Sequence, residues 1–114
     1  MKGDEVYLKH ILDAIEKIES YISVGHDAFI STSHWQDAVI RQLEIIGEAT
    51  KRLSSGLRSQ YAEVPWRRIA GLGDVLIHNY MGVDLDAVWE ITQKDLPVLK
   101  NHIQIVLADF LGNE

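Results

Sequence analysis

The chain has 114 residues, no cysteine and a formal net charge of −6 at pH 7. This length suits one domain with one hydrophobic core, so we expect residues 1–114 to form a single domain. The absence of cysteine excludes disulfides, thiolate metal sites and a cysteine nucleophile. No apolar run reaches the length of about 18 residues that a membrane span needs, and the N-terminal segment is acidic, so we expect a soluble cytoplasmic protein.

The first half of the chain has the pattern of two amphipathic helices. Apolar residues at three- and four-residue steps predict one helix over residues 4–24, which Gly25 ends. Residues 26–33 are expected to form a connector with a short turn. The second helix is expected from Trp35 to Leu53. It follows three candidate N-caps and two candidates for a capping box: Ser31, Thr32 and Ser33, with Gln36 or Asp37.

The middle of the chain is expected to hold a loop and a third helix. Residues 57–64 read as a loop. Pro65 suits the first turn of a helix, because its missing N–H is one that the helix would leave unpaired. An apolar stripe follows at helical spacing, and Gly82 supplies a stop. This helix therefore carries His78 toward its C-terminal end.

The last segment reads as helical from Leu85 to Phe110, with Asp84 as its candidate N-cap. Pro97 interrupts it, because proline removes a backbone hydrogen bond and clashes with the preceding turn. We expect either a kink near residues 93–96 or two helices, the second capped by Asp95. No stretch alternates with the period of a strand, so the sequence predicts an all-α up-down bundle of four to five helices.

Charge is distributed unevenly along the chain. Residues 41–83 hold six Lys or Arg against four Asp or Glu, whereas the segments on either side each carry a balance of −4. The net acidity argues against RNA or DNA binding by the surface as a whole. A local basic site around Arg67 and Arg68 remains one interpretation, and ordinary scatter of surface charge is the other.

The sequence gives little support for a metal site or for a hydrolase with a serine nucleophile. Asp74 and His78 are spaced i, i+4 and share a helix face, but two ligands are too few for a metal, and no Glu-x-x-His pair exists. Asp74 can instead hydrogen-bond His78, fix its tautomer and raise its pKa. Gly-x-Ser-x-Gly is absent, and the run Gly71–Gly73 is too short for a phosphate-binding loop. We therefore expect no metal and no cofactor.

The third chemistry is RNA cleavage without a metal ion. The RNA's own 2′-hydroxyl attacks the neighbouring phosphate, so the protein has to move protons and stabilise the charge on the phosphorane. A histidine with a pKa near neutrality does the first, and an arginine does the second. His78, followed by Tyr80, fits the proton-transfer role. The alternative is an ordinary surface histidine that the helix dipole favours.

Several stretches of the sequence resemble the HEPN superfamily and, within it, the HepT-like group. Together they cover nearly the whole chain: Gln36–Arg41, Leu43–Ala49, Pro65–Trp66, Leu76–Asp84, Val88–Trp89 and Asp95–Pro97. The resemblance implies an all-α fold, a two-fold homodimer and metal-independent endoribonuclease activity on an RNA substrate. It also implies a toxin whose antitoxin is a small nucleotidyltransferase of the MntA type.

The motif of the HepT-like group implies roles for single residues. It consists of Arg, four to six residues, His, one residue and Tyr. His78 and Tyr80 match, but Gly73 stands where the motif has Arg, and Arg68 lies outside the spacing. The resemblance implies that the partner transfers AMP to the Tyr80 hydroxyl. Gly at position 73 implies a toxin that is inactive or weakened, either because the Arg was lost naturally or because it was replaced.

Two other functions stay open at this stage. The chain can be a catalytically silent module that dimerises and holds a nucleotidyltransferase. It can also be a substrate-binding subunit for a transferase acting on small molecules. The natural codon at position 73 separates the first alternative from the toxin, because Arg favours the toxin and Gly favours the module.

Overall fold

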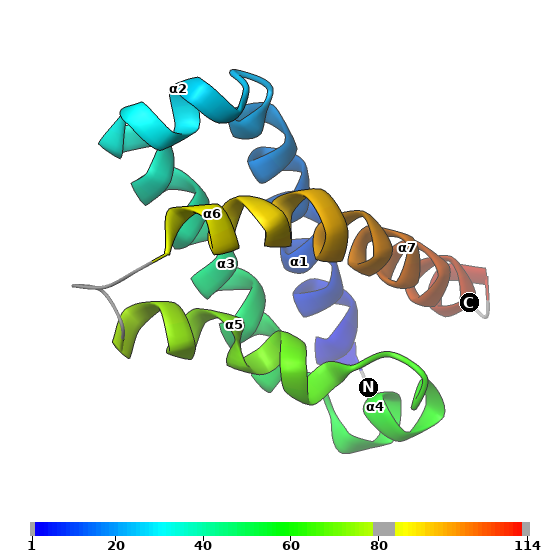
Figure 1. Ribbon diagram of the computed structural model, residues 1–114. Helices are drawn as coiled ribbons and strands as arrows, with labels where there is room; N and C mark the ends of the chain where they lie inside the picture. Colours follow the sequence, from blue (N-terminus) through cyan, green and yellow to red (C-terminus); the bar gives the residue numbers. More distant parts are fainter. Residues whose placement is uncertain (1, 79–83, 113–114) are drawn as a thin grey trace.

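A computed structural model describes residues 2–78 and 84–112, which form a helical bundle (Figure 1). No strand occurs among these residues. The helices are α1 (Lys2–Ile22), α2 (His26–Ser31), α3 (Ser33–Lys51), α4 (Ser55–Gln60), α5 (Trp66–His78), α6 (Leu85–Glu90), the π-helical turn η2 (Ile91–Asp95) and α7 (Leu96–Gly112). The predicted all-α up-down bundle is confirmed: α1, α3, α5 and α7 are its long helices, and short helices join or extend them.

The core lies where α3 packs against both α1 and α5, while α7 covers α1. The apolar stripes predicted from helical periodicity supply it. Among its fully buried side chains are Ile11 and Ile15 of α1, Leu43 and Ile46 of α3, and Ile103 of α7. Each such side chain contributes roughly 1.5–3 kcal/mol by leaving water.

The first connector is more ordered than the sequence predicts. Gly25 has φ 95°, and α2 follows it, so residues 26–33 are mostly helical. The expected capping box of α3 is wrong: Thr32 is its N-cap without a side-chain hydrogen bond. The Gln36 Nε2 atom instead donates to the carbonyls of Phe29 and Ile30 at 3.0 and 2.9 Å. Gln36 thereby satisfies carbonyls at the end of α2, which a helix leaves unpaired.

The expected loop over residues 57–64 also begins as a helix, α4. The Ser54 Oγ atom caps it by accepting from the Leu57 N–H at 3.2 Å. The Ser54 N–H and hydroxyl donate to the two oxygens of the buried Asp4 carboxylate, at 2.8 and 2.7 Å. This buried acceptor holds the start of α4 to the first turn of α1. Leu57 is buried and Tyr61 half-buried, so both side chains hold this segment against the core.

The chain passes Pro97 through a π-helical turn rather than through a break. In η2 the Leu96 N–H bonds to the Ile91 carbonyl, one residue beyond α-helical spacing. This wider turn precedes the proline, whose nitrogen has no hydrogen to donate. The Asp95 carboxylate, expected as a cap, instead accepts a hydrogen bond from Arg68 of α5 at 3.1 Å.

Candidate active site

The sequence motif lies on α5 and on the segment that follows it. Gly73, Asp74 and His78 belong to one continuous helix, and His78 is its last residue. Helical backbone therefore keeps the four-residue step between positions 74 and 78, which places both on one helix face. Tyr80 lies outside the described residues.

The structure resumes on the far side of the motif at α6. Asp84 is the N-cap of this helix, as predicted: its Oδ1 atom accepts from the N–H groups of Asp86 and Ala87 at 3.0 and 3.2 Å. Figure 1 shows the end of α5 and the start of α6 at the same edge of the bundle. Two helix ends therefore flank the motif, and Asp84 fixes one of them.

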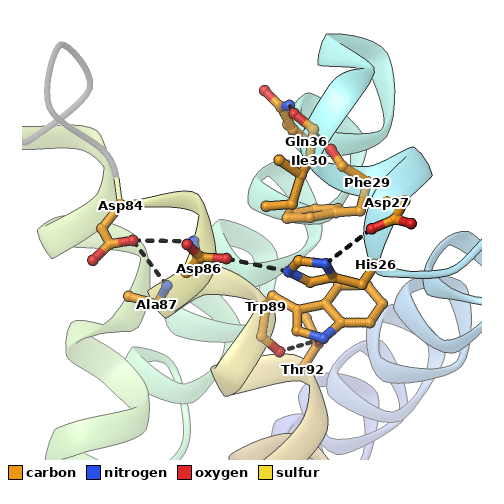
Figure 2. A network of polar contacts seen from close by, with 10 residues as sticks. All are labelled: His26, Asp27, Phe29, Ile30, Gln36, Asp84, Asp86, Ala87, Trp89 and Thr92. Carbon is orange, nitrogen blue, oxygen red and sulfur yellow. Dashed lines mark hydrogen bonds and ion pairs between the residues drawn. The ribbon is translucent and has the colours of Figure 1, made fainter.

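A polar and aromatic cluster joins the first turn of α6 to α2 (Figure 2). The His26 Nε2 atom lies 3.2 Å from Asp86 Oδ1, and its Nδ1 atom lies 3.6 Å from Asp27 Oδ1. The ring of Trp89 meets His26 edge to face, with centroids 5.3 Å apart, and packs at a tilt of 42° on Phe29, with centroids 5.4 Å apart. Because Phe29 is fully buried, the cluster connects the start of α6 to the core.

Sequence reasoning missed this cluster. His26 falls in a segment expected to be a connector, and its partner Asp86 is sixty residues further along the chain. The Gly25–His26 pair, which precedes the apolar Phe29 by three residues, was the available local signal, but it does not identify a partner.

The two arginines predicted to bind RNA lie at the other end of α5. Arg67 and Arg68 are both exposed, and Arg68 forms an ion pair with Asp95 at 3.1 Å. Eleven residues of helix separate Arg67 from His78, which corresponds to about 16 Å along the helix axis. Within one chain, the structure therefore does not bring these arginines together with His78.

A hollow of about 160 Å³ lies beside Arg68, between α5 and α7. Its walls are mostly apolar, with the Arg68–Asp95 pair and His102 at polar positions: Pro65, Ile69, Leu72, Leu96, Val98 and Leu99 complete the lining. Val98 and Ile105, seven residues apart on α7, are large apolar side chains that remain exposed.

Tyr61, Lys94 and Lys100 have raised pKa values, and all three lie outside residues 73–78. Burial and the hydrogen bond to Asp109 raise the pKa of Tyr61. The carboxylates of Glu90 and Glu19 raise the pKa values of Lys94 and Lys100, respectively. These shifts therefore report surface ion pairs and hydrogen bonds.

Among the side chains of residues 3–72 and 84–112, no group of three or more His, Asp or Glu could hold a metal ion. Among the helices that the structure describes, none combines the length and apolar character needed to cross a membrane.

The described residues form an all-helical bundle in which α5 ends at His78. Residues 11–106 match the family described as Ribonuclease HepT-like. The chain therefore belongs to the HepT-like ribonuclease family.

Individual relatives support this assignment. The chain is 43% identical, over 99% of its length, to a Methanocaldococcus jannaschii protein named "Gamma-glutamylcyclotransferase and putative RNase", and it spans 51% of that protein. It is 39% identical over 94% of its length to a "Putative RNase" of Caldanaerobacter subterraneus, spanning 96% of that chain. It is 40% identical over 86% of its length to "Probable ribonuclease HepT" of Thermococcus cleftensis, spanning 90% of it. No solved structure is significantly similar.

Proposed function

We propose that residues 1–114 form a single HepT-like endoribonuclease domain that acts in the cytoplasm and is weakened by Gly73. One observation carries the proposal: in a chain of this ribonuclease family, positions 73 to 78 lie on one uninterrupted helix that ends at His78. A side chain at position 73 and the histidine at position 78 would thus be carried by the same helix. Asp74, one turn before His78, is proposed to orient the ring.

The proposed reaction is transesterification within the RNA. The 2′-oxygen forms a bond to the adjacent phosphorus, the bond to the 5′-oxygen breaks, and the products are a 2′,3′-cyclic phosphate and a 5′-hydroxyl. The His78 imidazole transfers the proton that moves from the 2′-hydroxyl to the leaving oxygen. An arginine at position 73 would stabilise the charge on the phosphorane, which Gly73 cannot do. No divalent metal takes part in this scheme.

The partners follow from the resemblance to HepT-like toxins. We infer a homodimer, an RNA substrate whose phosphates contact Arg67 and Arg68, and an antitoxin that is an MntA-type nucleotidyltransferase. That enzyme is proposed to transfer AMP to the Tyr80 hydroxyl. The added phosphodiester brings about one negative charge and bulk next to a site for phosphate, so that RNA is kept away from His78.

Gly73 favours a second candidate, a catalytically silent dimer that serves as a binding module for a nucleotidyltransferase. A helix gains about 1 kcal/mol when Gly is replaced by a good helix former such as Arg, so Gly73 has no evident advantage for the fold. Such a module would still bind the nucleotidyltransferase but would not cleave RNA. An arginine restored at position 73 separates the two candidates, because a module without the other parts of a nuclease site remains inactive.

The test is cleavage of RNA by the Gly73→Arg variant, with analysis of the new ends. We expect a 2′,3′-cyclic phosphate and a 5′-hydroxyl, formed at the same rate with EDTA present. Cleavage that stops with EDTA, or that leaves a 5′-phosphate, would show that the proposed mechanism is wrong.

A further inference from the structure

An open groove of about 930 Å³ runs between α4 and the first turns of α5. Ser55, Arg58 and Ser59 line it from α4, and Arg67 and Arg68 line it from α5, with Pro65 between them. Every charged side chain along its walls is an arginine, although the chain as a whole carries a net charge of −6. The groove is therefore a local cationic surface on an acidic protein.

Two of these arginines lack an anionic partner. Arg68 is paired with Asp95, but Arg58 and Arg67 form no ion pair or hydrogen bond with any residue that the structure describes. Arg58 is half-buried, and its Nε atom is fully enclosed without a hydrogen-bond partner. A partly desolvated cation without a partner is unfavourable, so an anion that enters the groove would be stabilised there.

We propose that this groove binds backbone phosphates of single-stranded RNA, with Arg58 and Arg67 as the principal contacts. The inference rests on the proposed ribonuclease function and deepens it, because it adds Arg58 and the α4 wall to the RNA contact proposed for Arg67 and Arg68. The planar guanidinium fork matches phosphate oxygens in pairs, and the exposed hydroxyls of Ser55 and Ser59 add donors of the kind that contact phosphate.

The length of α5 relates the groove to the cleaved bond. Arg67 and His78 are about 16 Å apart along the helix axis. Each strand of duplex DNA advances about 3.4 Å per nucleotide along its axis, so a single strand stacked with the same rise would cover this distance in roughly five nucleotides. A single strand that follows α5 would therefore place one phosphate at His78 while a phosphate about five nucleotides away lies in the groove.

The test measures RNA binding to the intact chain by fluorescence anisotropy. The probe is a labelled 12-nucleotide RNA with 2′-O-methyl groups, which cannot be cleaved through its own 2′-oxygen. Arg58→Gln with Arg67→Gln should weaken binding at least tenfold and reduce the slope of log K against log salt by about 1.4, since each single-strand phosphate contributes about 0.7. Arg67→Gln alone, at an exposed position that leaves folding undisturbed, should weaken binding at least threefold.

The matched control removes the same charge from a different surface. Arg41 and Arg52 lie on the hollow between α3 and α1, where Tyr7 and His10 also lie. Arg41→Gln with Arg52→Gln should weaken binding less than twofold. An equal loss in both double variants, or an unchanged salt slope in the groove variant, would overturn the inference.

Two further outcomes identify what the groove binds and which proposal fails. If polyglutamate of equal charge binds as tightly as the RNA and loses affinity in the same variants, the occupant is an acidic protein surface and the RNA assignment is wrong. If the groove variants lose RNA binding while Gly73→Arg does not cleave RNA, the groove stands and the ribonuclease proposal fails. If Gly73→Arg cleaves while the groove variants bind normally, the groove inference fails.

Discussion

The His26 imidazole and the Asp86 carboxylate lie 3.2 Å apart and join the first residue of α2 to the first turn of α6. The Asp86 N–H also donates a hydrogen bond to the carboxylate of Asp84, the N-cap of α6. The start of α6 is therefore anchored twice, once by a helix cap and once by a contact across the bundle. Trp89 adds an apolar contact below the ion pair, where it packs on Phe29.

The first prediction concerns which of these contacts stabilises the start of α6. His26 and Asp86 are largely exposed, so a double-mutant cycle of His26→Ala with Asp86→Asn should give a coupling free energy below about 1 kcal/mol. Trp89→Ala should lower the free energy of unfolding by about 3 kcal/mol, because it removes a large ring from the core edge. Urea denaturation measures both. A coupling above about 2 kcal/mol would show instead that the ion pair is the main anchor.

The second prediction follows from the raised pKa of Tyr61. Burial, followed by the 3.2 Å hydrogen bond to Asp109, raises this pKa above its ordinary value of 10.0. The fold therefore favours the neutral phenol, and the resulting stabilisation is fully present below pH 10.0 and is lost as the pH rises through the folded-state pKa. Urea unfolding of the unchanged chain and of Tyr61→Phe should differ at about pH 8, and the advantage of the tyrosine should decrease above about pH 10.

Asp109→Asn is the control for the Tyr61 prediction. Its neutral side chain removes the negative charge near the phenol, so the pKa of Tyr61 should fall toward 10.0. A difference between the chain and Tyr61→Phe that stays constant across the alkaline range would contradict the assignment.

The third prediction is a symmetric homodimer in solution. A single copy is a thin bundle with extents of 46 × 26 × 20 Å. A two-fold pair would place two copies of the motif and two basic middle segments around one cleft, which concentrates positive charge where RNA would bind. Sedimentation velocity at micromolar concentration should give the mass of two chains. A monomer alone at this concentration would contradict the prediction.

The fourth prediction is AMP transfer to Tyr80 by the nucleotidyltransferase partner. Incubation of the chain with that enzyme, ATP and Mg²⁺ should raise its intact mass in adenylyl steps. Tyr80→Phe should abolish the gain because it lacks the acceptor hydroxyl. Tyr61→Phe, the same change at a tyrosine whose hydroxyl is near the surface, should leave the gain intact. The partner enzyme only needs access to the Tyr80 hydroxyl, so AMP transfer should not require Arg at position 73. A gain that persists in Tyr80→Phe would show that another residue is modified.

Features set by neighbouring residues could be predicted from the sequence. The buried faces of α1 and α3 follow from helical periodicity, and Ile11, Ile15, Leu43 and Ile46 are all fully buried. The Asp84 cap is equally local, because its carboxylate bonds N–H groups two and three residues ahead. Position 73 and His78 come from the spacing of the HepT-like motif, and their roles stay predictions.

Features that depend on distant residues could not be predicted. The sequence does not reveal that Gln36 reaches back to Phe29 and Ile30 instead of capping its own helix. The ion pair of Arg68 with Asp95 needs α5 to lie along η2. The groove at Arg58 likewise depends on how α4 and the start of α5 are placed, so residue composition showed the basic segment but not its shape.

The most direct test of the proposed ribonuclease site is the initial rate of RNA cleavage by Gly73→Arg, compared with the unchanged chain. The expected gain is at least about 10²-fold, the range that one donor to a developing oxyanion contributes. Gly73→Lys should recover much less, because a lysine cannot form the bidentate fork with phosphate oxygens. His78→Ala added to Gly73→Arg should return the rate to background. A Gly73→Arg variant that dimerises but cleaves no faster than the unchanged chain, or one whose activity survives His78→Ala, would contradict the assignment of this site.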